Sequence, residues 1–400
     1  MSEPHVRKAY VVVGSSYGDE GKGEITANIC RNLMPHKTLN ILTNGGSQRG
    51  HTVIDNEWEL GEIRALHHVC HHFGSGTFYN ADNLFSKYFI INPMNFVREE
   101  QKMYLERSTP KKFNELKFYC DSRCRWSTPY DMIVNQAIES ARGDQRHGSV
   151  GAGIWETICR YADSESMPLQ KFNNLDLHNK ETFLNRIAGY YRNKLHGLGI
   201  PLTKFVSEML SNDGLRRHFI EDCNWFCNQV TFVEESERVL RDYEYLVFEN
   251  GQGLLLSEDA NNVHTTPSNT GCTYAVEMMK DADLAMCPIE IDYVTRPYIT
   301  RHGAGPLEYE TTRNLLSSKI GIDSTNIFSK WQGELRYAAL SVSNLIERIK
   351  NDFAICRAQM PHSKMKIKVT HSDECELDTS VDAASLILYN LLKLMECKEG

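Results

Sequence analysis

Short apolar runs separated by longer polar stretches dominate the hydrophobic pattern of this chain. A short apolar run without polar alternation is typical of a parallel β-strand that is covered on both faces. Such runs predict strands at residues 9–13, 38–43, 87–92, 117–120, 243–249, 288–294, 297–301 and 366–370.

Between these strands, apolar residues return at helical spacing. This spacing predicts helices at 22–33, 92–106, 335–350 and 381–395, and a mostly helical, polar region at 180–242. Strands and helices therefore alternate, which favours an α/β fold. We expect a single large domain over residues 1–400, in which helices flank a mostly parallel central sheet and the 180–242 region is a helical elaboration.

The ends of the predicted strands indicate where a ligand would bind. In open parallel sheets, ligands bind beyond the carboxyl ends of the strands. The loops after Val13, Thr43, Glu249, Arg301 and Thr370 should therefore share one cleft.

Composition restricts the class of function. The 400 residues carry a formal net charge of −8, which argues against a protein that coats nucleic acid with a basic face. No apolar run reaches the length of about 18 residues that a membrane span needs, and the first residues do not resemble a signal segment. The 12 cysteines form no C-x-x-C pair, as expected for reduced thiols. We therefore expect a cytoplasmic protein without nucleic-acid or membrane partners.

The stretch "VVVGSSYGDEGKGEITANI" (11–29) joins a predicted strand to a predicted helix through a glycine-rich turn. Backbone N–H groups of such a turn, at a helix N-terminus, favour a phosphate. The turn is not a Walker A loop, because six residues separate Gly14 from Gly21 and a glycine follows the lysine. Two carboxylates, Asp19 and Glu20, stand where they would repel a phosphate. A tight turn without a ligand would explain the glycines and not these acids.

A second glycine-rich loop, "TNGGSQRGHTV" (43–53), follows another predicted strand and brings Gln48, Arg49 and His51 together. An isolated histidine is usually a surface or core residue. A histidine in a glycine-rich loop beyond a strand is better placed for acid–base chemistry, so His51 is a candidate catalytic residue.

Five motifs resemble, in order, those of the adenylosuccinate synthetase family. "GDEGKG" and "GGSQRGHT" resemble its G-D-E-G-K-G and G-G-x-N-A-G-H-T patterns, and "FENGQGLLLSED", "TTPSNTG" and "TRHGAGPL" resemble three later ones. The matches run from residue 11 to about residue 375. The resemblance implies an α/β ligase, expected to be a homodimer. It would join L-aspartate to C6 of a 6-oxopurine nucleotide with the use of a nucleoside triphosphate and Mg²⁺.

The family's site residues carry over to the matching positions. By resemblance, Asp19 takes the N1 proton of the purine, and His51 hydrogen-bonds the 6-oxygen as that oxygen attacks the γ-phosphate. Asp19 would also bind Mg²⁺ together with the Gly50 carbonyl, and the ion would resolve the charge conflict in the first loop. The implied triphosphate-binding residues are Gly18, Glu20, Gly21, Lys22, Gly23, Glu24 and Asp373.

Two further sets of residues follow from the resemblance. The acceptor nucleotide is expected at Asp19, Gln48, Arg49, Ser149, Val150, Arg160, Gln252, Thr266 and His302, with Arg160 reaching the phosphate held by a partner subunit. L-aspartate is expected at Thr325, Asn326, Lys330 and Arg336.

Several segments resemble the phage 2-aminoadenylosuccinate synthases, which use dGMP in place of IMP on the route to 2,6-diaminopurine DNA. They include "HHFGSGTF", "HGSVGAGIWET" and "TNIFSKWQGELR". This resemblance favours dGMP as the acceptor, with IMP as the alternative, and a phage-encoded protein in the host cytoplasm. The chain departs from the phage pattern at Asp19, where serine is usual, and it lacks the arginine-rich aspartate loop of the housekeeping enzymes.

The resemblance leaves the triphosphate open between GTP and ATP. Asp373 in "VTHSDE" falls where a family carboxylate reads guanine, which favours GTP. The family's C-terminal guanine-binding segment has no counterpart in this sequence, which favours ATP.

Two other interpretations are weaker. A non-catalytic, purine-nucleotide-binding regulator would need neither Asp19 nor His51. On a strand, the segment "HHVCHHF" (67–73) would place His68, Cys70 and His72 on one face, but the sequence offers no further ligands for a zinc site.

Overall fold

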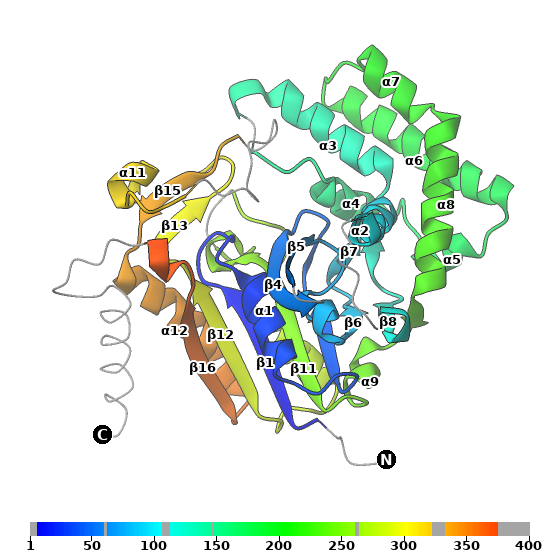
Figure 1. Cartoon of the computed structure of the whole chain (residues 1–400). Helices are drawn as coiled ribbons and strands as arrows, with labels where there is room; N and C mark the ends of the chain where they lie inside the picture. The colour runs from blue at the N-terminus through cyan, green and yellow to red at the C-terminus, as the bar shows by residue number, and fades with distance from the viewer. Residues whose placement is uncertain are drawn as a thin grey trace, which may run out of the picture.

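The computed structural model describes residues 6–59, 62–105, 113–145, 147–260, 264–321 and 333–374, and an eight-stranded sheet forms its centre (Figure 1). Every strand pair in this sheet is parallel. The strands, in spatial order, are β10 (Thr231–Val233), β8 (Phe118–Asp121), β6 (Asp82–Phe85), β2 (Thr38–Leu42), β11 (Tyr245–Gly253), β1 (Lys8–Gly14), β12 (Ile289–Thr295) and β16 (Ser363–Val369).

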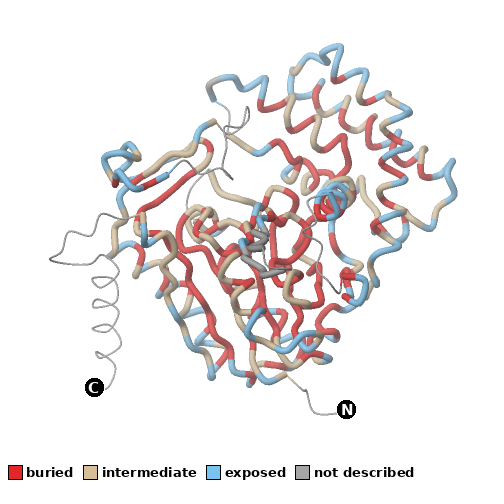
Figure 2. Tube along the Cα trace, in the orientation of Figure 1, coloured by how far each residue is buried: buried red, intermediate tan, exposed pale blue. Residues whose placement is uncertain are grey.

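Helices cover both faces of the sheet, as its apolar strands require. On one face, α10 (Thr273–Asp281) and α12 (Val342–Gln359) form a core with side chains such as Val11 and Phe248. On the other face, Cys30 of α1 (Lys22–Arg31) packs with Val247 of β11. Buried residues accordingly run along the strands in Figure 2. Each fully buried aliphatic or aromatic side chain contributes roughly 1.5–3 kcal/mol to stability.

A second core, rich in aromatic residues, joins the helices beside the sheet. Trp126, Tyr130 and Phe172 belong to it and are almost fully buried. These helices are α2 (Pro93–Leu105), α3 (Pro129–Arg142), α4 (Ile154–Ala162), α5 (Leu169–Asn173), α6 (Leu177–Gly197), α7 (Lys204–Leu210) and α8 (Asp213–Gln229). The α3 helix begins with a capping box, in which Thr128 and Asp131 exchange hydrogen bonds, and with proline at its first position.

Three small sheets lie beside the central sheet. The hairpin of β4 (His51–Glu59) and β5 (Glu62–Cys70) is antiparallel, and β3 (Gly45–Gly46), β7 (Phe89–Ile91) and β9 (Arg125–Trp126) form a parallel sheet. The third sheet is antiparallel and consists of β13 (Tyr298–Arg301), β15 (Arg336–Ala339) and β14 (Glu310–Thr311), next to α11 (Arg313–Leu316). Among the described residues, the remaining α-helix is α9 (Ser236–Leu240). In the described part of the chain, no helix is long and apolar enough to cross a lipid bilayer.

The predicted fold class and most predicted strands are confirmed, with three corrections. The runs at 87–92 and 297–301 are strands, but β7 and β13 belong to small sheets. Residues 335–350 do not form one helix, because β15 occupies the first part and α12 begins at Val342. The short strands β6 and β10 were not predicted. The predicted helix at 381–395 lies outside the described residues.

Candidate active site

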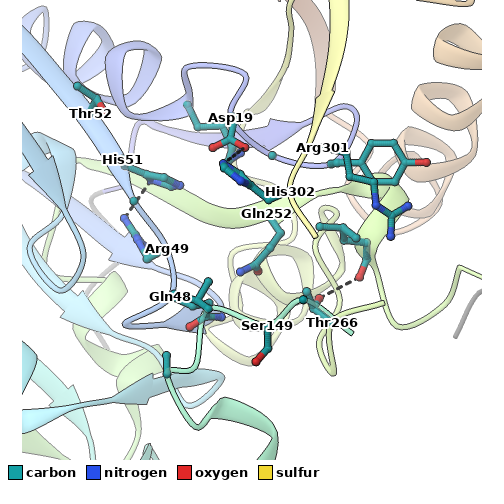
Figure 3. A pocket seen from close by; sticks show the side chains of 18 of the residues that line it. Asp19, Gln48, Arg49, His51, Thr52, Ser149, Gln252, Thr266, Arg301 and His302 are labelled. Carbon is teal, nitrogen blue, oxygen red and sulfur yellow. Dashed lines mark hydrogen bonds and ion pairs between the residues drawn. The ribbon is translucent and has the colours of Figure 1, made fainter. Parts of the chain in front are cut away.

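One cavity of about 1490 Å³ opens at the carboxyl ends of the central strands. It is lined by residues from the loops after β1, β2, β11, β13 and β16, and by the segment that leads into α4. The prediction that these five loops share a cleft is therefore confirmed. Figure 3 shows the side chains of Asp19, His51, Gln252 and Thr266 gathered around this space.

The conformation of the loop after β1 is stabilised by Glu20, which belongs to the loop itself. The Glu20 Oε1 atom accepts hydrogen bonds from the backbone N–H groups of Ser16 (2.9 Å) and Gly18 (3.0 Å), and its Oε2 atom pairs with Lys22 Nζ at 3.0 Å. Glycine is required at residue 14, because a Cβ there would lie 2.5 Å from Glu20 Oε2. Glu20 is thus buried within the loop and does not line the cavity, which fits a structural role rather than the expected contact with a triphosphate.

Two helix N-termini at this cavity lack a side-chain cap. The N-cap residues are Gly21 for α1 (φ 87°) and Gly153 for α4 (φ 74°), and neither helix receives a side-chain hydrogen bond there. Both glycines line the cavity. Unpaired N–H groups and the helix dipole make such termini suitable for anionic groups, and two of them can serve two phosphate-bearing ligands.

Asp19 points into the cavity from a left-handed backbone conformation, with φ at 59°. Arg296 Nε donates to its main-chain oxygen at 2.6 Å, which fixes this turn. Burial raises the pKa of the Asp19 carboxyl, and His302, whose Nε2 atom lies 3.6 Å from Asp19 Oδ2, opposes this shift. The carboxylate is therefore available to a ligand and close to the predicted nucleotide contact His302.

His51 is oriented by a residue that the sequence analysis did not single out. Its Nδ1 atom lies 2.6 Å from Glu249 Oε1, and Arg49 Nη2 lies 2.8 Å from the same oxygen. Although burial alone would raise the pKa of Glu249, Arg49 and the hydrogen bonds from His51 and Ser75 hold that pKa well below its usual range. Because Glu249 is ionised, Nδ1 carries the proton and donates it. Burial, reinforced by Arg49, lowers the pKa of His51 to about 4.

Most of the predicted acceptor-binding residues line the same cavity. They are Gln48, Arg49, Ser149, Val150, Gln252, Thr266 and His302. Gln252 has a left-handed backbone (φ 57°), and the side-chain oxygens of Gln48 and Gln252 are buried without a hydrogen-bond partner in the described structure. Among the predicted triphosphate- and metal-binding residues, Gly18, Asp19, Gly21, Lys22, Gly23, Glu24, Gly50 and Asp373 also line the cavity.

Arg160 does not fit its expected role as a phosphate contact. It is fully buried, its Nε donates to Asp131 Oδ1 at 2.9 Å, and its other nitrogens donate to the carbonyls of Glu165 and Trp126. This side chain therefore has no free surface on which it could meet a phosphate, in its own subunit or in another.

The expected aspartate-binding residues are mostly not placed. Thr325, Asn326 and Lys330 lie outside the described residues. Arg336 does not line the cavity, because its guanidinium binds Glu310 and the carbonyls of Gly303 and Gly305.

Two features of the structure were not predicted from the sequence. Arg301, at the end of β13, lines the cavity and was not selected as a site residue. Glu99 on α2 supplies a neighbour for His68 and Cys70 that the sequence did not indicate. Its carboxylate already accepts backbone N–H groups of residues 71 to 73, so this buried cluster ties the end of β5 to α2.

Comparisons with known proteins agree with the motifs. A family model described as adenylosuccinate synthetase matches residues 11–336. The chain is similar to adenylosuccinate synthetase of Prochlorococcus marinus (strain MIT 9313), with 26% identity over 311 residues, covering 75% of this chain and 63% of the relative. It is also similar to that of Psychromonas ingrahamii (28% over 310 residues, 75% and 63%). The chain thus matches about 63% of the length of these curated relatives.

Two solved structures share the fold. One is fully ligated adenylosuccinate synthetase from Plasmodium falciparum, with a TM-score of 0.63 and 16% identity, covering 91% of this chain and 77% of that one. The other is succinoaminodeoxyadenylate synthetase of cyanophage S-2L bound to dGMP and dATP as an energy donor, with a TM-score of 0.58 and 15% identity, covering 98% and 91%. At these identities the likeness shows the fold alone.

Proposed function

The chain belongs to the adenylosuccinate synthetase family, and from this premise we propose that it is a carbon–nitrogen ligase that joins L-aspartate to C6 of dGMP. The product would be 2-amino-2′-deoxy-N6-succinyl-AMP, a precursor of 2,6-diaminopurine DNA. The observation that carries the proposal is that Asp19 and a His51 oriented by Glu249 line one cavity, beside two uncapped helix N-termini. A regulator that only binds nucleotides would need neither the oriented histidine nor the carboxylate.

The proposed reaction has two steps. Asp19 accepts the N1 proton, the 6-oxygen of the purine attacks the γ-phosphorus, and the bond from that phosphorus to the nucleoside diphosphate breaks. The free amino group of aspartate then forms a bond to C6 and gives up one proton, the C6–O bond breaks, and the phosphate leaves with that proton as HPO₄²⁻. Nδ1 of His51 is committed to Glu249, so Nε2 is the ring nitrogen left for the 6-oxygen. Nε2 donates a hydrogen bond to that oxygen when the ring is protonated, because both ring nitrogens then carry a proton. Positioning and charge stabilisation supply most of the rate enhancement in phosphoryl transfer.

Asp19 and Gly50 fit the proposed Mg²⁺ ion. Both line the cavity, and a carboxylate and a main-chain carbonyl are oxygen ligands of the type that Mg²⁺ prefers. The left-handed turn at Asp19 aims its carboxylate, which lies 3.6 Å from His302 Nε2, at the space where phosphates would lie. When bound, the ion would offset the negative charge of the triphosphate.

The preference for dGMP over IMP concerns the 2-amino group of guanine and the 2′-hydroxyl of the ribose. The buried side-chain oxygens of Gln48 and Gln252 can accept hydrogen bonds from an amino group, which supports dGMP. The cyanophage S-2L protein, whose solved structure holds dGMP, also supports this acceptor. IMP is the second candidate, because Asp19 would meet the same N1–H in either purine and because the curated relatives are adenylosuccinate synthetases.

The triphosphate is proposed to be GTP or ATP. Asp373 lines the cavity and can accept two N–H donors from guanine, whereas adenine would turn the N1 lone pair towards it. Asp373 is exposed in the described structure, so this mismatch should cost less than the about 1–3 kcal/mol of a buried one. The S-2L structure was obtained with dATP as energy donor, which supports an adenine nucleotide instead. We also propose that L-aspartate is the co-substrate and that the protein forms a homodimer.

Product formation from each acceptor tests the proposal directly. Purified protein would be incubated with aspartate, Mg²⁺ and either GTP or ATP, and with dGMP, GMP or IMP at equal concentration. We expect turnover in the order dGMP, GMP, IMP, since a site built to hydrogen-bond a substrate group rejects the analogue that lacks it by roughly 10⁴-fold or more. Faster turnover of IMP would identify an ordinary adenylosuccinate synthetase. Absence of phosphate release with every combination would favour the regulator.

A further inference from the structure

The acidic co-substrate needs a cation, and among the described residues of the site the other candidates are already bound to groups of the protein. Aspartate carries two carboxylates, and a desolvated carboxylate requires charged or hydrogen-bonding partners. Arg336, the expected partner, is occupied: its Nε donates to Glu310 at 2.7 Å, and its Nη1 donates to the carbonyls of Gly303 and Gly305 at 3.0 and 2.9 Å.

Most cationic side chains that line the cavity are already bound. Lys22 pairs with Glu20 at 3.0 Å, Arg49 with Glu249 at 2.8 Å, and Arg142 with Glu139 at 2.5 Å. Arg296 donates to the Asp19 carbonyl and to the Tyr298 hydroxyl. These four cations are therefore committed to groups of the protein.

Arg301 differs from these four residues. It is 2% exposed and lines the cavity, and within the described residues no carboxylate pairs with it. Its Nη1 donates to the Pro306 carbonyl at 2.6 Å, whereas its Nε is buried without a hydrogen-bond partner in the described structure. A buried, uncompensated donor of this kind is costly unless a ligand completes it.

The surroundings of Arg301 hold its guanidinium in a fixed place. The group lies over the ring of Tyr17, 4.4 Å from the ring centroid. Gly305 has φ at +103°, and a Cβ at this residue would come within 2.3 Å of Arg301 Nη2, so the backbone leaves room that only glycine allows. A guanidinium fixed in this way loses little entropy when it binds a carboxylate.

Arg301 is also close to the proposed chemistry. Tyr17 is two residues before Asp19 in the first loop, and His302, the residue after Arg301, approaches Asp19 Oδ2 to 3.6 Å. Figure 3 shows Arg301 on the same side of the pocket as His302 and Asp19. A carboxylate bound at Arg301 would thus lie near the place where an amine must reach C6.

We propose that Arg301 binds a carboxylate of the amino-acid co-substrate and takes the role of the arginine-rich loop that this sequence lacks. The inference rests on the proposed ligase function and extends it to a residue of the aspartate site. The phosphate of a nucleotide is the other anion that a guanidinium could bind, but the two uncapped helix N-termini at Gly21 and Gly153 already suit phosphates.

Steady-state kinetics of Arg301→Gln test this proposal. We expect KM for aspartate to rise about ten- to a hundred-fold, since a charge-assisted hydrogen bond is lost, while KM for the acceptor nucleotide and for the triphosphate stays within about two-fold. Arg301→Lys keeps the charge without the planar fork and should give an intermediate KM for aspartate. The matched control is Arg313→Gln on α11, outside the cavity lining, for which all three constants should match the wild type.

Each result has a distinct meaning. An unchanged KM for aspartate in a folded Arg301→Gln or Arg301→Lys variant would overturn the proposal, and so would a rise confined to a nucleotide, which would assign Arg301 to a phosphate. If Arg301→Gln does not fold, the lysine variant carries the test. If the wild-type protein forms no product with any acceptor, the proposed function fails and the aspartate site fails with it. A rise confined to aspartate supports both.

Discussion

At the scale of single residues, the site is marked by strain that the rest of the fold sustains. Asp19 and Gln252 are non-glycine residues with positive φ, at 59° and 57°, and both line the cavity. Such conformations cost of order 1–3 kcal/mol each and persist where surrounding contacts fix them. These backbone conformations direct the Asp19 carboxylate and the Gln252 amide into the same cavity.

Asp19→Asn separates the chemistry of this residue from its backbone role. Asparagine visits the left-handed region as readily as aspartate, so the loop and the melting temperature should be preserved. The amide cannot accept the N1 proton and is a poor Mg²⁺ ligand, so turnover should fall by roughly 10²–10⁴-fold. Initial rates and thermal melts of the two proteins measure both effects. Turnover close to wild type would place the base elsewhere.

Glu249→Gln should damage both stability and turnover. The substitution removes the buried carboxylate that pairs with Arg49 and His51. It should lower the free energy of unfolding by about 3–5 kcal/mol, because the charge of Arg49 is left uncompensated in the interior. The folded fraction should lose roughly 10²-fold in turnover as His51 loses its orientation. Urea denaturation and initial rates report the two effects separately. Glu244→Gln is the control, since its partners Arg7 and Lys37 are exposed, and it should cost below about 1 kcal/mol. Unchanged turnover in folded Glu249→Gln would remove Glu249 from the catalytic assembly.

At the scale of elements, the first turn of α1 and the start of β4 fit closely together. Gly23 is the second residue of α1, and a Cβ at this position would meet the Thr52 carbonyl at 2.6 Å and the His51 carbonyl carbon at 2.9 Å. The glycine thus lets α1, whose N-terminus is proposed to bind phosphate, touch the strand that begins with His51.

Gly23→Ala should therefore displace His51, the proposed catalytic histidine. Alanine is the better helix former, by about 1 kcal/mol, yet the hairpin would have to move by part of an ångström or more. A shift of about 1 Å at a reacting group can cost about 10²-fold in rate, so we expect a loss of this order. Gly189→Ala on α6 is the matched control, because its Cβ would meet nothing within 4 Å, and it should keep full turnover with equal or higher stability. Full turnover of Gly23→Ala would show that β4 can move away from the added methyl group without loss of activity.

Element boundaries show where sequence reasoning succeeds and where it does not. The buried strands β1, β2, β11, β12 and β16 were predicted because their apolar runs are a local signal. The strand β15 was missed because its state depends on pairing with β13 and β14, which are distant in sequence. The residues of β15 come just before α12, and apolar residues at helical spacing in both segments led to one predicted helix over 335–350.

The same division applies to the site. Asp19, His51 and Gln252 follow predicted strands in the sequence, and all three line the cavity, as the rule that ligands bind beyond strand ends indicates. The predicted role of Arg160 was wrong because the side chain pairs with Asp131, 29 positions away. A short sequence motif does not reveal such a long-range ion pair. Glu249 was open to detection as an acid that ends a buried apolar strand. Arg301 was not, since its proposed role depends on a buried Nε without a hydrogen-bond partner in the described structure, which no sequence pattern reveals.

At the scale of the whole molecule, the cavity lies between two cores. One core packs the central sheet against α10 and α12, and the other packs α2, α3 and α5 to α8. The loop after β1 supplies Asp19 and the end of β11 supplies Gln252, whereas the segment before α4 supplies Ser149 and Val150. A nucleotide bound in the cavity would therefore contact residues from both sides and link the two packing units.

Acceptor binding should therefore stabilise the protein, and the extent should rank the acceptors. A ligand that binds only the folded state adds about 2.7 kcal/mol at a concentration of 100 times its Kd. We expect the melting temperature to rise with dGMP concentration, and to rise less with IMP at the same concentration, because IMP leaves the Gln48 and Gln252 oxygens without the 2-amino partner. Thermal melts over a range of concentrations measure this without any turnover. Deoxyribose 5-phosphate is the control, since it offers the phosphate without the base and should shift the transition least. Equal shifts with dGMP and IMP would mean that the site does not read the 2-amino group, and the choice of dGMP would then have no basis in binding.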